Sequence, residues 1–443
     1  MADETTIPLE QAERVDHQLV RAIGVPGLTA NIVNATIGAG IFVLPAAVAK
    51  ILGPAAPLAF ICCAIAMVLF VTCFAIAGSR VSLTGGLYAY VEVAFGRYVG
   101  FLAGVLYGIT AISAVAGVGN VLVDSLGGLV PWLANPIVRV GLMLLVYASL
   151  VIINMRGVRG GSGAVGVVTV TKLLPILLFL SVGIFFINRA NFSWSVFPSG
   201  KELGDSVLLL LFAFVGIEVA LIPSGEVKNP ARTVPRSVYF ALVVTTIIYL
   251  MIQIVAQGTL GLDLANHTKI PLAEASAIFL GNAGRIILIV GAAISAFGFV
   301  ASDILSSPRM LFAIGRDGIL PGWFAHVHPR YRSPDVAIIV YAGVAFGLSV
   351  CSSFEQLAVL SNVAVLLMYL LCFAGVWPLL RRQTHSERVF TFPGMQVMPA
   401  LAIGAVLCLF WLTKPWDKFM KIAAILVVFS VLYFFRTLFR RKS

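Results

Sequence analysis

Charged side chains are scarce in this sequence. They make up 11% of its 443 residues, whereas 60% of the residues are hydrophobic and the mean hydropathy is +1.01. A soluble globular chain carries about a quarter charged residues, so this scarcity excludes a soluble globular protein. A membrane-spanning helix needs roughly 20 apolar residues, and such segments nearly fill the chain. Residues 1–20 lack the apolar core and cleavage site of a signal peptide, so we expect no cleaved leader.

The sequence also lacks the residue patterns of enzymes and metal proteins. Its six cysteines lie in apolar runs without metal-ligand or redox spacing, and its five histidines fall outside the apolar segments. His326 and His328 share one loop, but no further candidate ligands lie nearby in the sequence. No glycine-rich stretch has the strand–turn–helix context of a nucleotide motif. We therefore expect no enzymatic activity, no metal and no cofactor.

A net charge of +11 would suit nucleic-acid binding, but the positions of the basic residues favour a membrane topology. Arginine and lysine recur in alternate loops, for example at Arg80, Arg156, Arg232, Arg330 and Arg440, and the intervening loops hold fewer. Cytoplasmic loops of membrane proteins carry such an excess. The pattern predicts an integral protein of the cell membrane, in contact with lipid, with both termini in the cytoplasm and no nucleic-acid partner.

Apolar runs bounded by charges and by glycine and proline clusters predict twelve transmembrane helices. They lie near residues 23–50, 54–79, 97–127, 136–154, 162–188, 205–224, 236–258, 284–315, 335–351, 356–381, 397–413 and 417–437. We expect a cytoplasmic segment over 1–22, a ten-helix core over 23–382, and helices 11 and 12 with a cytoplasmic C-terminus over 383–443. The loop 259–283 is expected to form a short helix over the mouth.

Two of these helices contain residues that do not suit an unbroken membrane helix. Helix 1 contains 36-TIGAGIFVLP-45, and helix 6 contains 212-FAFVGIEVALIPSGEVKNP-230. Broken helices at matching positions of two five-helix halves, here 23–188 and 205–381, are typical of inverted-repeat transporters. The sequence therefore predicts an all-α membrane protein with a 5+5 inverted repeat and discontinuous helices 1 and 6.

Unwound backbone has a specific use inside a membrane. It survives only where it is buried in protein or faces a wet cavity. Freed N–H groups attract carboxylates, and freed carbonyl groups attract ammonium or metal cations. Glycine permits both the unusual dihedral angles and the close approach of a ligand. A pair of such breaks suits a zwitterion such as an amino acid.

Four stretches, each in the expected topological place, resemble the amino acid–polyamine–organocation (APC) superfamily of amino acid transporters. They are 38-GAGIFVLP-45, 85-GGLYAYVEVAFGRYVGF-101, 212-FAFVGIEVALIPSGEVKNPARTVPRS-237 and 309-RMLFAIGRDGILP-321. The resemblance covers residues 23–382. It implies twelve helices, a five-plus-five inverted repeat, and alternating access around helices 1, 3, 6, 8 and 10.

The resemblance also implies which residues surround the substrate. Backbone groups for the substrate carboxylate would come from helix 1, at Thr36, Ile37, Gly38, Ala39 and Gly40. Carbonyl groups for its amine would come from helix 6, at Ala213, Phe214, Val215 and Gly216. The aromatic gate would be Phe212, and helices 3 and 10 would add Thr110, Ala111, Val115, Ser361 and Asn362.

Three ionisable residues lie within predicted helices: Lys172, Glu218 and Asp303. A charge in mid-membrane costs at least about 2.5–3.5 kcal/mol by insertion scales, so each is a functional candidate. In sodium-coupled relatives of this fold a sodium ion links helix 1 to helix 8. In many APC members a helix-5 lysine, in a context like 169-TVTKLLP-175, takes that position. The resemblance thus implies that the ammonium of Lys172 bonds helix-1 carbonyls near Gly38 and that transport is independent of sodium.

Each ionisable residue leaves alternatives open. Loss of a proton from a buried lysine is chemically accessible, so proton coupling through Lys172 is a hypothesis. Glu218 is either a proton-sensitive latch or a structural acceptor for N–H groups freed by the break. Asp303 departs from the commoner pattern of the family. It could pair with Lys172, carry a proton, or bind a cationic or amine-bearing substrate.

These features predict a secondary active transporter for amino acids or related amines. We expect it to be sodium-independent and to work by proton symport or by exchange. The alternatives are a polyamine or cationic amine exchanger, a channel, and a non-transporting sensor of the same fold. The sequence leaves the substrate and the oligomeric state open.

Overall fold

The computed structural model describes residues 23–80, 87–156, 161–193, 197–218, 227–316, 319–381 and 390–440. Within these residues the chain is helical, and its only strand-like pairing is an isolated parallel bridge between Ile23 and Val227. The predicted segment 1–22 and the end of the predicted helix 205–224 lie outside the described residues.

The first part of the chain contains a helix in three pieces, followed by six helices. The three pieces are α2 (Val25–Thr36), η1 (Ala39–Phe42) and α3 (Leu44–Leu52). The helices that follow are α4 (Ala56–Gly78), α5 (Leu87–Phe95), α6 (Arg97–Leu129), α7 (Pro136–Met155), α8 (Gly161–Gly183) and α9 (Gly200–Phe214).

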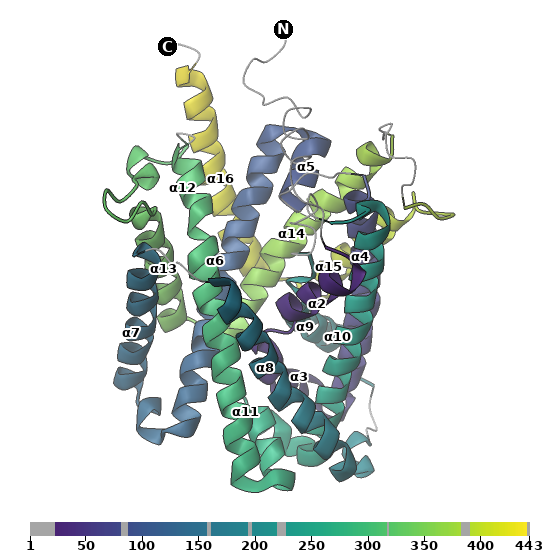
Figure 1. The fold of residues 1–443 in the computed structure, drawn as a ribbon. Coiled ribbons are helices and arrows are strands. Elements are labelled where there is room, and N and C mark those ends of the chain that lie inside the picture. Colours follow the sequence, from purple (N-terminus) through teal and green to yellow (C-terminus); the bar gives the residue numbers. More distant parts are fainter. Residues whose placement is uncertain are drawn as a thin grey trace.

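The second part begins with two long helices, α10 and α11. Its helices are α10 (Pro230–Leu260), α11 (Pro271–Ser306), α12 (Pro308–Arg316), α13 (Asp335–Cys351), α14 (Phe354–Arg381), α15 (Met398–Thr413) and α16 (Trp416–Arg440). Figure 1 shows the pieces α2 and α3 in the middle of the bundle, with α7 and α13 along one side and α4 and α10 along the other.

Each of the twelve predicted ranges contains a helix or its pieces. Seven helical segments among the described residues are long and apolar enough to cross a membrane, and three apolar helices are shorter. The number of crossings stays a prediction. One expectation was wrong in detail, because the predicted helix 284–315 is two helices that meet at Ser307, with Pro308 beginning the second.

The loop expected over 259–283 is largely helical. A short 3₁₀ helix, η8, runs over Gly261–Asn266, and α11 begins at Pro271. At Gly281 the backbone turns to φ 62°, where α11 bends sharply. The ten residues before this bend form the short helix that the sequence led us to expect, and Figure 1 shows it at the opposite end of the bundle from the end of α16.

Small residues allow the long helices to lie close together. A Cβ atom added to Gly119 of α6 would lie 2.6 Å from the hydroxyl of Tyr147 in α7, and one added to Gly291 of α11 would lie 2.6 Å from Pro175 in α8. Membrane helices associate largely through such close packing, because lipid supplies no hydrophobic driving force. By contrast, only 6% of the apolar part of α16 is buried, as expected for a helix that faces lipid.

Candidate functional site

The first break interrupts the helix at Ile37 and Gly38. Helix α2 ends at Thr36, Ile37 has φ −74° and ψ 86°, and Gly38 is extended. The N–H of Gly38 donates to the carbonyl of Thr36 over 2.8 Å, which closes a tight three-residue turn. The chain then resumes as η1, whose first N–H groups have no partner within their own helix. The predicted discontinuity of helix 1 is therefore present, about two turns before Pro45.

The second break follows Phe214. Helix α9 ends there, Val215 is extended, and Gly216 has φ 114°, a left-handed conformation that favours glycine. A Cβ atom on Gly216 would lie 2.9 Å from the carbonyl oxygen of Ala35, next to the first break. The two breaks thus touch each other through their backbones. The continuation of this helix, with Pro223, lies outside the described residues.

Tyr249 of α10 joins the two breaks. Its buried hydroxyl lies 2.8 Å from the carbonyl oxygen of Thr36 and 2.8 Å from that of Ala213. A phenol has one proton, so it can donate fully to only one of these carbonyls at a time. The ring of Phe214 packs edge-on against Tyr249 with ring centres 5.2 Å apart. The junction therefore holds more acceptors than its protein donors can satisfy.

Lys172 of α8 reaches the first break. Its side chain is 8% exposed, and its ammonium donates to the carbonyl oxygen of Asn34 over 2.6 Å. The amide oxygen of Asn34 is buried and has no hydrogen-bond partner. Lys172 therefore lies against the end of α2, two residues before Thr36, as the resemblance implied.

Glu218 forms a hydrogen bond at the second break. Its carboxylate accepts from the N–H of Gly216 over 3.0 Å and from the hydroxyl of Tyr369 in α14 over 2.8 Å. The side chain is 7% exposed. Of the two roles left open for Glu218, the contacts are those of an acceptor for a freed N–H group. They also join the break to α14, so a latch remains compatible with them.

Asp303 does not lie against Lys172. Its carboxylate accepts from the hydroxyls of Tyr341 in α13 and Ser307, the latter over 2.8 Å. These contacts lie at the end of α11, where α12 begins. Neither residue forms an ion pair in the described part of the chain. The suggested pairing of Asp303 with Lys172 is therefore wrong for this conformation, since each group already has a closer partner.

The ring of Phe212 packs against Gly40, just after the first break. A Cβ atom on Gly40 would lie 2.9 Å from the ring of Phe212, and that ring meets Phe354 of α14 edge-on with centres 5.3 Å apart. A small pocket lined by Phe42, Val43 and residues of α11 has a volume of about 10 Å³, roughly the space of one water molecule.

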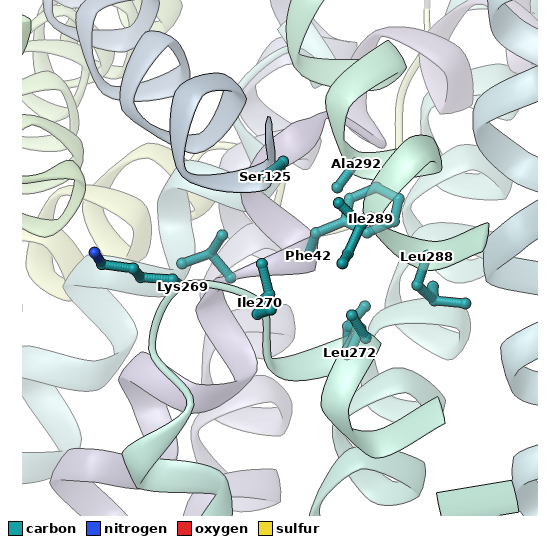
Figure 2. A pocket seen from close by; sticks show the side chains of 10 residues that line it. Phe42, Ser125, Lys269, Ile270, Leu272, Leu288, Ile289 and Ala292 are labelled. Carbon is teal, nitrogen blue, oxygen red and sulfur yellow. The ribbon is translucent and has the colours of Figure 1, made fainter. Parts of the chain in front are cut away.

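Figure 2 shows the lining of this pocket. Apolar side chains from η1 and α11 converge on it, and Ser125 of α6 lies at one edge. Lys269 stands at the rim with its amine directed away from the interior. The pocket is therefore small and its lining is mostly apolar.

The candidate residues on α6 and α14 hold helices together. The hydroxyl of Thr110 donates to Leu106 within α6, and the carbonyl of Thr110 accepts from Ser361 over 3.1 Å. Asn362 donates to the carbonyl of Leu208 in α9 over 2.6 Å, and its own amide oxygen is buried without a partner.

Two further candidates lie on the same stretch of α6. The carbonyl of Val115 accepts from Tyr147 of α7, and the side chains of Ala111 and Val115 are buried. All sixteen candidate substrate residues lie on the elements that the sequence predicted. Contact of any of them with substrate stays a prediction.

Sequence reasoning missed three tyrosines: Tyr249, Tyr341 and Tyr369. Tyr249 had a detectable signal, because Thr245, Tyr249, Gln253 and Gln257 recur every fourth residue and all four are completely buried. Residues four apart lie on one helix face, so this is a polar stripe along α10 in an otherwise apolar helix. Tyr341 and Tyr369 had no such signal.

The chain matches a known protein family over most of its length. Residues 23–439 match the family described as amino acid permease. The chain is similar to a branched-chain amino acid permease of Bacillus subtilis (strain 168), with 28% identity over 96% of this chain and 94% of the relative.

Other relatives have different named substrates. A serine/threonine exchanger of Bacillus subtilis (strain 168) is 28% identical over 88% of this chain and 90% of the relative. The chloroplastic cationic amino acid transporter 9 of Arabidopsis thaliana is 30% identical over 70% of this chain and 58% of the relative. The names of these relatives all describe transport. They differ in the charge of the amino acid side chain that is named.

Proposed function

This chain belongs to the amino acid permease family, and from that premise we propose that it is a secondary active transporter that works by alternating access. It is an integral membrane protein and an amino acid transporter rather than an enzyme. The proposal concerns its mechanism, its coupling and the way in which it holds a substrate.

The proposed architecture has twelve membrane crossings in the cell membrane and cytoplasmic termini. Residues 23–188 and 205–381 form the two halves of an inverted repeat. The positions of the breaks support this arrangement, because each half begins with an interrupted helix. The bridge between Ile23 and Val227 links the start of the first half to the second half.

We place the substrate backbone between η1 and the end of α9, which pack against each other. The free N–H groups at the start of η1, around Ala39 and Gly40, hold the carboxylate. The carbonyls at the end of α9, from Ala213 to Gly216, hold the ammonium. Phe212 lies over this space and moves to admit substrate. The contact between the two breaks is the observation that carries this proposal.

The proposed coupling uses Lys172 in place of a sodium ion. Its ammonium on the Asn34 carbonyl holds the end of α2 as a bound cation would. Transport is then independent of sodium and is either driven by protons or works by exchange. The hydrogen bond of 2.6 Å between Lys172 and Asn34 supports this position for the charge.

Purified protein in liposomes tests the function. Liposomes loaded with unlabelled amino acids should take up the labelled compound in sodium-free buffer, and the uptake should saturate. A pH gradient should accelerate net uptake if protons drive it and leave exchange unchanged if they do not. A channel would instead give conduction that follows voltage and shows no acceleration by internal substrate. A sensor would be stabilised by its ligand without any flux.

A further inference from the structure

We infer that the transported amino acids have neutral, apolar side chains, and that cationic amino acids and polyamines are not substrates. This inference rests on the proposed function and narrows it. It concerns the side chain of the substrate, whereas the two breaks concern its carboxylate and amine. The relatives carry both neutral and cationic substrates by name, so only the residues of this chain can decide between them.

A cationic side chain in a closed site needs a carboxylate partner, because an unpaired charge removed from water is strongly disfavoured. The two carboxylates inside the helices are already engaged. Glu218 accepts from the Gly216 N–H and from Tyr369, and Asp303 accepts from Tyr341 and Ser307. A second cation would have to break these contacts within the protein.

Most of the other carboxylates described lie at helix ends with partners of their own. The ion pairs are Arg139–Asp124, Lys201–Asp205, His267–Asp263, Arg285–Glu274, His326–Asp335 and Lys418–Asp417. Glu355 is the exception that matters here, because it follows Phe354, whose ring packs on Phe212. Its side chain is half-buried at the start of α14. Glu355 is therefore the carboxylate through which a cationic substrate would have to be recognised.

The charge at the first break is positive, whereas the Glu218 carboxylate at the second break is already engaged by Gly216 and Tyr369. The ammonium of Lys172 lies on Asn34, four residues before Gly38. Lys269 stands at the rim of the small pocket that Phe42 lines. Like charges repel most strongly where water is excluded. Lys172 therefore favours a carboxylate near the first break and disfavours a second cation there.

The space that Phe212 now fills has apolar walls. Gly40 and Phe354 lie against the ring of Phe212, and Leu44 lies beside Gly40. When Phe212 moves, the side chain of the substrate replaces its ring against these surfaces. Thr110, the nearest candidate hydroxyl on α6, already donates within its own helix. An aliphatic side chain gains by burial against these surfaces, whereas a cationic side chain would have to leave them and reach Glu355 at the start of α14.

The test compares labelled compounds in one preparation of the full chain. Liposomes are loaded with unlabelled leucine, valine, serine, arginine, lysine or putrescine, and uptake of the same labelled compound is measured in each. We expect leucine or valine to exchange at least about tenfold faster than arginine, lysine and putrescine, the discrimination that an unpaired buried charge produces. Arginine, lysine or putrescine at a rate equal to leucine overturns the inference and leaves the proposed function intact. Serine faster than leucine overturns the apolar part alone.

Failure of the proposed function would give a different result from failure of this inference. If no compound exchanges in any arm, while the protein still elutes as a folded species, both the function and this inference are wrong. Two variants then assign the selectivity. Asp303→Asn and Glu355→Gln should leave the ratio of leucine to arginine uptake within about twofold of the parent protein, because neither carboxylate binds the side chain of the substrate. Selective loss of arginine uptake in either variant would show that this carboxylate binds the cationic side chain. That result would overturn the inference.

Discussion

The two helix breaks are held by opposite kinds of partner. At the first break, donors satisfy freed carbonyls, since Lys172 donates to Asn34 and Tyr249 to Thr36. At the second break, an acceptor satisfies a freed N–H, since Glu218 accepts from Gly216. Side chains therefore mainly engage carbonyls at the first break and an N–H at the second, where the Ala213 carbonyl shares the Tyr249 hydroxyl.

The groups left over differ in the same way. At the first break the N–H groups that begin η1 have no partner within their helix, whereas at the second break it is the last carbonyls of α9. Only the Ala213 carbonyl is partly engaged, through the hydroxyl that Tyr249 shares with Thr36. The leftover groups would hold a carboxylate at the first break and an ammonium at the second. This difference supports the proposed orientation of the substrate.

The largest effect is expected from Gly216→Ala. The residue has φ 114°, and a Cβ atom would lie 2.9 Å from the backbone oxygen of Ala35. Backbone strain and a backbone clash together should cost more than about 2 kcal/mol of stability and abolish transport. The melting temperature in detergent measures the loss of stability, and uptake measures the loss of transport. The control Gly141→Ala, with nothing within 4 Å of the new atom, should melt no lower than the parent protein; equal melting of both variants would contradict the tight contact between the breaks.

Removal of the cation at the first break should come next. In Lys172→Met the carbonyl of Asn34 loses its buried ammonium partner, and α2 loses its tie to α8. We expect uptake to fall by at least about tenfold, as for the loss of a charged buried hydrogen bond, in protein that still folds. Lys201→Met, at an exposed lysine paired with Asp205, is the matched control. Unchanged rate and pH dependence in Lys172→Met would remove both the cation role and proton coupling through this residue.

Loss of the shared hydroxyl should have an intermediate effect. Tyr249→Phe keeps the ring against Phe214 and leaves the carbonyls of Thr36 and Ala213 without this donor. We expect a loss of about 1–3 kcal/mol of stability, the range for an unpaired buried group, and slower uptake. Tyr239→Phe on the same helix removes a hydrogen bond to Thr72 and serves as comparison. If both variants lose the same uptake, Tyr249 has no special role at the junction.

The smallest effect should separate the two glycines of the first break. Gly40→Ala places a methyl group 2.9 Å from the ring of Phe212, whereas Gly38→Ala meets nothing closer than 3.9 Å. The ring can shift, so Gly40→Ala should fold normally and change the apparent affinity for substrate a few-fold, and Gly38→Ala should change it less. Concentration dependence of uptake distinguishes them. A stronger effect of Gly38→Ala would mean that backbone freedom, rather than the packing of Phe212, is what the motif requires.

The sequence predicted the helices well because each is a long apolar run ended by charges or by glycine and proline. It also located both breaks, since Gly38 and Gly216 stand in runs that would otherwise be ordinary membrane helices. It placed Lys172 at helix 1 only through the family resemblance. The contact itself, at the Asn34 carbonyl, joins residues 138 positions apart, and no local pattern contains that information.

The hydrogen-bond partners of Asp303 could not be predicted from the sequence. Its charge inside a helix was visible in the sequence, but three partners were equally compatible with it. Its hydroxyl partner Tyr341 comes from another helix, 38 residues away, and looks like any other aromatic residue of an apolar run. The same holds for Tyr369, which meets Glu218 across 151 positions. Side-chain pairing between helices depends on their rotation and depth, which hydropathy does not fix.

The sequence alone determined that this is a helical membrane protein, where its helices lie and which two are interrupted, because those properties follow from the cost of placing charge and bare backbone in hydrocarbon. Only the tertiary structure decided that the interruptions touch, that donors serve one and an acceptor the other, and that Asp303 lies apart from Lys172. Such pairings depend on distances between segments far apart in the chain, and only packing sets those distances.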